Sequence, residues 1–120
     1  MRLGLMIFPR FCGRSLTRRR SFSFAEHYPL LKYKYLCVVG SRSYSPYGKD
    51  VCERLIAGLA GYPIVIVSGL ALGVDGIAHR AALAAGLPTV GIPGSGLDEE
   101  VLYPRAHVGL AREIVEKKGA

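Results

Sequence analysis

The chain has 120 residues, half of them apolar, with 16 Lys and Arg against 9 Asp and Glu. This length limits it to one ordinary domain with a modest core, and so apolar a composition excludes a fully disordered chain. The basic excess lies in residues 1–35, which hold eight basic side chains and one acidic, whereas residues 36–120 hold eight of each. A high pI suggests a nucleic-acid partner, but here that argument applies only to the leading segment.

Residues 1–35 are rich in Arg and Ser and show no clean periodicity. An organelle transit peptide has this composition, but a disordered basic tail, or a start codon assigned too far upstream, explains it more simply. We therefore expect a basic, irregular N-terminal extension over residues 1–35 and a partial Rossmann-like domain over residues 36–120.

Cysteine usage and hydropathy bear on the compartment. Cys12, Cys37 and Cys52 form no CxxC pair and no zinc-ligand spacing, so no metal site is expected. An odd count without a disulfide framework fits a reducing cytoplasm. Residues 55–74 carry no charge, but Gly and Pro residues divide the run. Buried elements are therefore expected there rather than a transmembrane segment.

After residue 35, apolar runs alternate with amphipathic segments, and the β-branched run at 64–67 is typical of a strand buried on both faces. Strands are predicted at residues 36–39, 64–67 and 89–92, and helices at residues 47–60, 75–85 and 105–118. The strands recur at the length of a βαβ unit. The expected fold class is α/β, a three-layer Rossmann-like half-sheet of parallel strands with flanking helices, in a chain cut short after its third helix.

In such a sheet the strands end at one edge, where helix N–H groups and glycine backbones can receive phosphate. The first loop of this edge, residues 40–48, supplies serine hydroxyls, the Arg42 guanidinium and two tyrosines able to stack on bases. It is not GxGxxG, so the dinucleotide-binding fingerprint is missing. A turn rich in Ser and Pro with an exposed Arg is the plain structural alternative.

The second loop, residues 68–75, contains glycines but no positive charge. Asp75 is expected to cap the helix that follows it, with a hydrogen-bonded His79 one turn later. A catalytic Asp–His pair is the less favoured interpretation, because no nucleophile is implicated beside it.

The third loop, residues 93–98, again offers backbone amides, and Tyr103 and Arg105 follow near the same edge. Acidic side chains at positions 98–100 would repel phosphate, so we expect them to be solvated. The loop therefore predicts a phosphate contact through the backbone more than through side chains.

Three blocks of sequence carry a resemblance to a known family. They are Val38-Val39-Gly40-Ser41-Arg42 with Tyr47-Gly48, Val67-Ser68-Gly69-Leu70-Ala71 with Gly73-Val74-Asp75 and Ala78-His79, and Gly94-Ser95-Gly96-Leu97-Asp98 with Tyr103-Pro104. In this order and spacing, over roughly residues 36–118, the chain resembles the DNA-processing protein family DprA/Smf.

The resemblance implies a Rossmann-like domain that binds single-stranded DNA in DNA uptake, competence, natural transformation and recombination. Family members usually form homodimers and load a RecA-type recombinase, with no established catalytic reaction, so neither an enzyme nor a cofactor is expected. The residues implied in DNA and phosphate binding are Gly40, Ser41, Arg42, Ser45, Ser68, Gly69, Leu70, Gly73, Gly94, Ser95 and Gly96.

The chain departs from the family at Leu72, where relatives often carry Lys or Arg, so Arg42 would have to carry an unusual share of phosphate recognition. The family also continues past the third helix, which indicates a fragment or a disrupted reading frame. One alternative is a phosphoribohydrolase of the lysine-decarboxylase-like kind. Residues 93–97 lack the second Gly and the Thr of its Pro-Gly-Gly-x-Gly-Thr motif. The other alternative is a truncated remnant without function.

Overall fold

The computed structural model describes residues 2–5, 32–95 and 100–117. Strands and helices alternate along the part of the chain that was predicted to be a domain. The elements are β1 (Arg2–Leu5), β2 (Lys34–Val39), α2 (Pro46–Ala57), β3 (Ile64–Ser68), α3 (Val74–Ala84), β4 (Thr89–Gly91), the 3-10 helix η1 (Arg105–His107) and α4 (Val108–Glu116).

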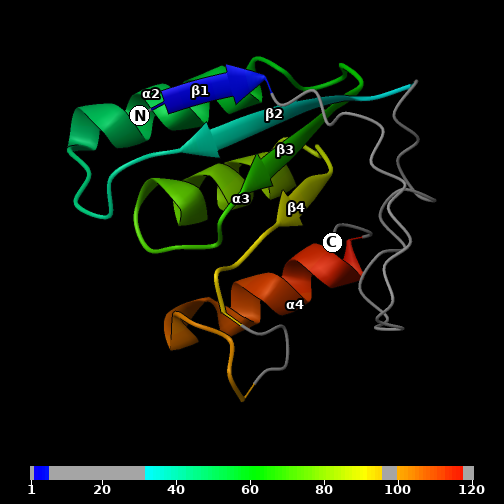
Figure 1. The fold of residues 1–120 in the computed structure, drawn as a ribbon. Coiled ribbons are helices and arrows are strands. Elements are labelled where there is room, and N and C mark those ends of the chain that lie inside the picture. Colours follow the sequence, from blue (N-terminus) through cyan, green and yellow to red (C-terminus); the bar gives the residue numbers. More distant parts are fainter. Residues whose placement is uncertain (1, 6–31, 96–99, 118–120) are drawn as a thin grey trace.

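The four strands form one sheet in the order β1-β2-β3-β4, and the last three run parallel (Figure 1). Leu36 of β2 lies opposite Ile66 of β3, which in turn lies opposite Thr89 of β4. Each parallel neighbour is reached through a helix, as in a chain of βαβ units. The predicted α/β class, a Rossmann-like half-sheet of parallel strands with flanking helices, is confirmed.

The leading segment differs from its prediction at two places. Arg2–Leu5 was expected to be irregular, but it forms β1 and pairs antiparallel with β2, with Arg2 opposite Val39. Its backbone groups satisfy the edge of β2, which needs no particular side-chain pattern and so leaves little signal in the sequence. Residues 34 and 35 also belong to β2 rather than to the extension. Residues 6–31 lie outside the described residues.

Side chains alternate between the two faces of the sheet along each strand, so the core forms two clusters, one on each face. Val38 and Ile66 face α2 and α3, where they meet Cys52 and Ile56 in one buried cluster. The helices lie side by side on this face of the sheet (Figure 1). The opposite face carries a second buried cluster: Tyr35, Val65, Val67 and Val90.

The small residues of α3 let it approach the sheet closely, as its alanine stripe predicts. Ala78 and Ala82 have no exposed surface, and Ala81 and Ala85 pack beside them. A third cluster joins the second loop to the last helix through Leu70, Leu102, Leu110 and Ile114. This cluster packs the loop after β3 against the last helix and holds it in place.

Helix boundaries shift from their predicted positions for local reasons. The first helix begins one residue early, at Pro46, because Ser45 caps it by accepting from Gly48 N–H at 3.1 Å. The last predicted helix opens as a 3-10 turn over Arg105–His107 before α4 begins. Within the part of the chain that the structure describes, no helix is both long and apolar enough to cross a membrane.

Candidate functional site

The loops after β2, β3 and β4 enclose a cavity of about 220 Å³ at the carboxyl edge of the sheet. All three loops contribute to its wall, together with the segment before η1. The described residues that line it are Arg42, Gly69, Ala71, Leu72, Gly94, Ser95, Tyr103 and Pro104. Four of the residues predicted for phosphate binding, Arg42, Gly69, Gly94 and Ser95, therefore come together around one space.

Arg42 is the cationic side chain among these lining residues. It is exposed, and within residues 32–95 and 100–117 its guanidinium makes no ion pair or hydrogen bond. Its five N–H donors are free to meet a planar or tetrahedral anion from solvent. Arg42 therefore supplies the positive charge of the cavity.

One tyrosine lines the cavity, and two more are exposed on the first loop and at the start of α2. Tyr103 lines the cavity, is 63% exposed, and donates its backbone N–H to Ser95 Oγ at 3.0 Å. Tyr44 and Tyr47 of the first loop and helix are also exposed. A flat, amphipathic ring that is already exposed can stack on a nucleobase without displacing a core contact.

Three serines that were predicted to bind DNA have internal partners. Ser41 Oγ accepts from Ser43 N–H at 3.0 Å and donates to Ser43 O at 2.8 Å, which closes a local turn. Ser45 caps α2. Ser68 is buried and donates to Val38 O at 2.6 Å, which ties the end of β3 to that of β2. Their visible contacts shape the loops, and none of the three lines the cavity.

Two glycines fix the first and second loops against each other. A Cβ on Gly40 would lie 2.8 Å from the Val74 side chain, and one on Gly73 would meet the backbone of Ser41 and Arg42. Gly73 also has φ +85°, a conformation that favours glycine. The two loops thus touch backbone to backbone. Gly96, also a predicted binding residue, lies outside the described residues.

Asp75 does not cap its own helix, so that prediction is wrong. The N-cap of α3 is Gly73, which has no side chain to accept a hydrogen bond. Asp75 lies in the first turn, is 7% exposed, and its Oδ2 accepts from Gly69 N–H at 3.1 Å. The carboxylate reaches back to the loop instead, because that loop passes over the helix start.

His79 is hydrogen-bonded, as predicted, but its partner is far along the chain. Its Nδ1 lies 2.7 Å from Thr89 Oγ1, and the Thr89 hydroxyl also lies 3.0 Å from Ile66 O. Burial lowers the pKa of His79 to about 4; the Ser68 backbone opposes this with a smaller raising effect, and His107 and Arg80 add slightly to the lowering. The ring is neutral at pH 7, and its Nε2 has no hydrogen-bond partner among the described residues.

His107 is a buried residue of the site that sequence reasoning missed. Its Nδ1 donates to Leu70 O at 2.8 Å, from η1 across to the second loop. Its ring lies over Gly76 of α3, where an added Cβ would come within 2.7 Å of Cε1. A single His in a turn gives no periodic signal, so the sequence alone could not have indicated this contact.

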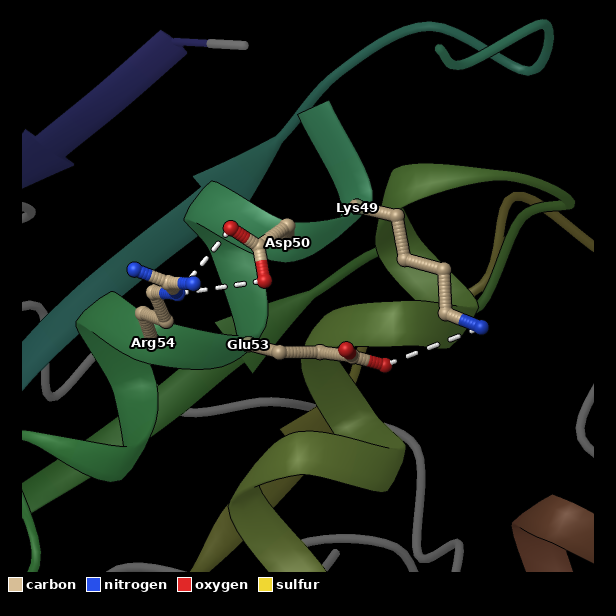
Figure 2. Close-up of polar contacts among 4 residues, drawn as sticks. All are labelled: Lys49, Asp50, Glu53 and Arg54. Carbon is tan, nitrogen blue, oxygen red and sulfur yellow. Dashed lines mark hydrogen bonds and ion pairs between the residues drawn. The ribbon is translucent and has the colours of Figure 1, made fainter. Parts of the chain in front are cut away.

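The remaining charges along α2 are paired within the helix. Figure 2 shows Arg54 beside Asp50, with Nε 3.0 Å from Oδ2, and Lys49 beside Glu53, with Nζ 3.9 Å from Oε1. These exposed i,i+4 pairs add little stability, but they neutralise the cations of the helix. Arg42 is thereby distinguished from its basic neighbours.

Comparison with known proteins identifies relatives of this chain. The model of the family described as DNA recombination-mediator protein A matches residues 24–120. The chain belongs to this family. The protein Smf of Escherichia coli is 41% identical over 85 residues, which is 71% of this chain and 22% of that protein. The DNA processing protein DprA of Streptococcus pneumoniae is 49% identical over 78 residues, 65% of this chain and 27% of that protein.

The fold of the family is shared as well. The X-ray structure of DprA from Streptococcus pneumoniae superposes with a TM-score of 0.61 at 44% identity, and covers 68% of this chain and 28% of the other. The chain thus spans about a quarter of the length of these DprA/Smf relatives. The resemblance read from the three loop blocks is confirmed, and the chain is related to proteins of DNA processing and recombination.

Proposed function

We propose that the carboxyl edge of the sheet binds single-stranded DNA, with a phosphate at the cavity and bases stacked on Tyr103 and on the exposed tyrosines of the first loop and α2. The observation that carries the proposal is the Arg42 guanidinium, which has no partner among the described residues, on a cavity whose wall includes the exposed Tyr103. A backbone phosphate pairs well with the guanidinium fork, and stacking tolerates any base. The combination favours a flexible single strand, whose bases can turn toward the rings.

The size of the cavity supports a contact to part of a chain. Pockets for whole small ligands generally measure about 300 to 1,000 Å³, and this one is smaller, at about 220 Å³. It suits one phosphate and its sugar, with the rest of the strand lying over the edge. Several such weak contacts along a strand would add up to useful affinity.

The wider role follows the family. We include in the proposal the homodimer and the RecA-type recombinase that the resemblance implies, and a cytoplasmic role in natural transformation. The Cys37 and Cys52 side chains are free thiols, in keeping with a reducing compartment. The chain spans about a quarter of the length of its relatives, so the homodimer and the recombinase are proposed from family membership alone.

A phosphoribohydrolase is less well supported by the site. Acid–base catalysis needs a carboxylate or imidazole within reach of the substrate. Among the described residues that line the cavity, the ionisable side chains are Arg42 and Tyr103. Asp75 is engaged with Gly69, and His79 is buried against Thr89. We therefore propose a binding protein without a catalytic reaction.

The test is a titration of fluorescent oligo(dT) with the full chain over a range of salt concentrations. Arg42→Ala should weaken binding about 10- to 100-fold and lower the slope of log K against log salt by about one, because one phosphate contact is lost. Arg54→Ala is the matched control: Arg54 is equally charged and exposed but paired with Asp50 on α2. It should change affinity less than about twofold.

The basic leading segment needs its own control. Substituting Arg18, Arg19 and Arg20 with Gln in the full chain removes charge from residues 1–35 without deleting β1. If this variant loses all affinity while Arg42→Ala binds like the unaltered chain, the segment binds the DNA and the proposed site is wrong.

A further inference from the structure

Leu70, in the loop after β3, has an unusual backbone that is held from two sides. It has φ +60°, a left-handed conformation that a leucine rarely adopts. The amide before it, Gly69 N–H, donates to Asp75, and its own carbonyl accepts from His107 Nδ1 at 2.8 Å. Such a conformation persists only when the surroundings fix it.

The second hydrogen bond has a consequence for the next amide. The Leu70–Ala71 peptide bond is trans, so its C=O and N–H point in opposite directions. Since His107 holds the Leu70 carbonyl toward the buried interior, the Ala71 N–H is directed away from it. Ala71 lines the cavity, and its N–H makes no hydrogen bond to another described residue.

We infer that His107 is a positioning residue: by fixing the Leu70 carbonyl it turns the Ala71 N–H into the cavity, as a donor to a phosphate oxygen. The inference rests on the proposed function. The Ala71 N–H would also supply part of the phosphate contact that a basic side chain at position 72 gives in relatives, where this chain has Leu72. The ligand class for this donor is an anionic oxygen, here that of a phosphodiester.

The position of His107 is itself fixed, which a positioning residue requires. Its imidazole is buried, at 4% exposure, and packs on Gly76, where any side chain would displace it. The neighbouring Leu102 and Leu110 belong to the cluster that also buries the Leu70 side chain. These contacts fix the imidazole relative to the second loop.

A pair of shape-matched variants of the full chain tests the inference. His107→Asn keeps an N–H donor at the δ position, whereas His107→Leu has the same branching and no donor. We expect His107→Leu to weaken oligo(dT) binding about tenfold and His107→Asn to stay within about threefold. The salt slope should not change in either, because an amide releases no counterion, in contrast to Arg42→Ala.

The amide can also be observed directly. In ¹⁵N–¹H spectra of the full chain, oligo(dT) should shift the Ala71 resonance in the unaltered chain and in His107→Asn, and leave it nearly unmoved in His107→Leu. Thermal unfolding of each variant accompanies these titrations, so that binding is compared only at temperatures where every variant is folded.

The outcomes separate this inference from the proposed function. If Arg42→Ala weakens binding while His107→Leu does not, or if His107→Asn loses as much as His107→Leu, His107 does not position a donor and the DNA site stands. An Ala71 resonance that oligo(dT) leaves unmoved in the unaltered chain overturns the inference too. If Arg42→Ala and His107→Leu both bind like the unaltered chain, the proposed function fails as well.

Discussion

The first and second loops of the site differ in how they are held. The side chains of the first loop are exposed, and the Ser41 hydroxyl bonds to Ser43, two residues away, while the Ser41 carbonyl accepts from Val74 N–H at 3.1 Å. The backbone of the second loop is held by two side chains that follow it in the sequence: Asp75 accepts from Gly69 N–H, and His107, from η1, donates to the Leu70 carbonyl. The first loop thus presents a charged side chain that can adapt, and the second presents a backbone set in advance. A preorganised backbone raises the affinity of a binding site, and an adaptable side chain broadens the range of ligands that it accepts.

The largest expected effect comes from the point where the two loops touch. Gly73→Ala would put a Cβ against the backbone of Ser41 and Arg42 at a residue with φ +85°. We expect a loss of about 3 kcal/mol in the free energy of unfolding, measured by urea denaturation. Gly94→Ala is the control, since its added Cβ would meet no described atom within 4 Å apart from its chain neighbours, and it should cost less than about 0.5 kcal/mol. Equal losses in both variants would show that the loops do not depend on this contact.

The packing of α3 on the sheet should be sensitive to acid, because the buried His79 of α3 bonds to Thr89 of β4. His79 has a folded-state pKa of about 4 against an ordinary value of 6.5, because it is buried. The unfolded chain therefore takes up this proton first, so the contribution of His79 is fully present above pH 6.5 and is lost as the pH falls toward 4. Between pH 7 and pH 5 this amounts to about 2 kcal/mol.

The measurement is the free energy of unfolding at both pH values for the unaltered chain and for His79→Gln. The glutamine variant should lose about 2 kcal/mol less over this interval, since other titrating groups act equally in both. An identical pH dependence in the two proteins would mean that the His79 ring is accessible to protons in the folded chain.

The smallest effect is expected in the first loop. Ser41→Ala removes a hydroxyl whose hydrogen bonds in the structure are both to Ser43, at an exposed position. We expect about 0.5 kcal/mol of stability and less than about threefold of oligo(dT) affinity to be lost. A loss of oligo(dT) affinity as large as that of Arg42→Ala would instead indicate that the Ser41 hydroxyl contacts phosphate. The first loop would then also bind through a group held in a set position.

The parts of the fold that were predictable are those with a periodic signal. The β-branched run at 64–67 and the alanine stripe of α3 each indicate their burial, and the buried Val65 and Ala78 bear this out. The spacing of the strands also locates the loops, so the sequence alone predicts that Arg42, Gly69 and Gly94 lie at one edge of the sheet. What made this possible is that consecutive parallel strands end on the same side.

The features that could not be predicted are contacts that no repeating pattern in the sequence encodes. Asp75 looked like a helix cap because caps are local, but its partner is Gly69 in the folded loop. Neither the His107–Leu70 bond nor the pairing of Arg2 with Val39 has a sequence pattern that repeats. The hydroxyls of Ser45 and Ser68 suited an anion by chemistry, and the structure gives them partners within the chain.

The cavity is lined by residues from Arg42 to Pro104, so its walls come from every βα unit of the sheet. No single unit contains the site, and it exists only when all of them are assembled. Any ligand held there would bind the folded chain and not the unfolded one, and would raise the whole unfolding transition together. At a ligand concentration one hundred times its dissociation constant the gain is about 2.7 kcal/mol. For so small a protein a melting curve is therefore also a binding assay.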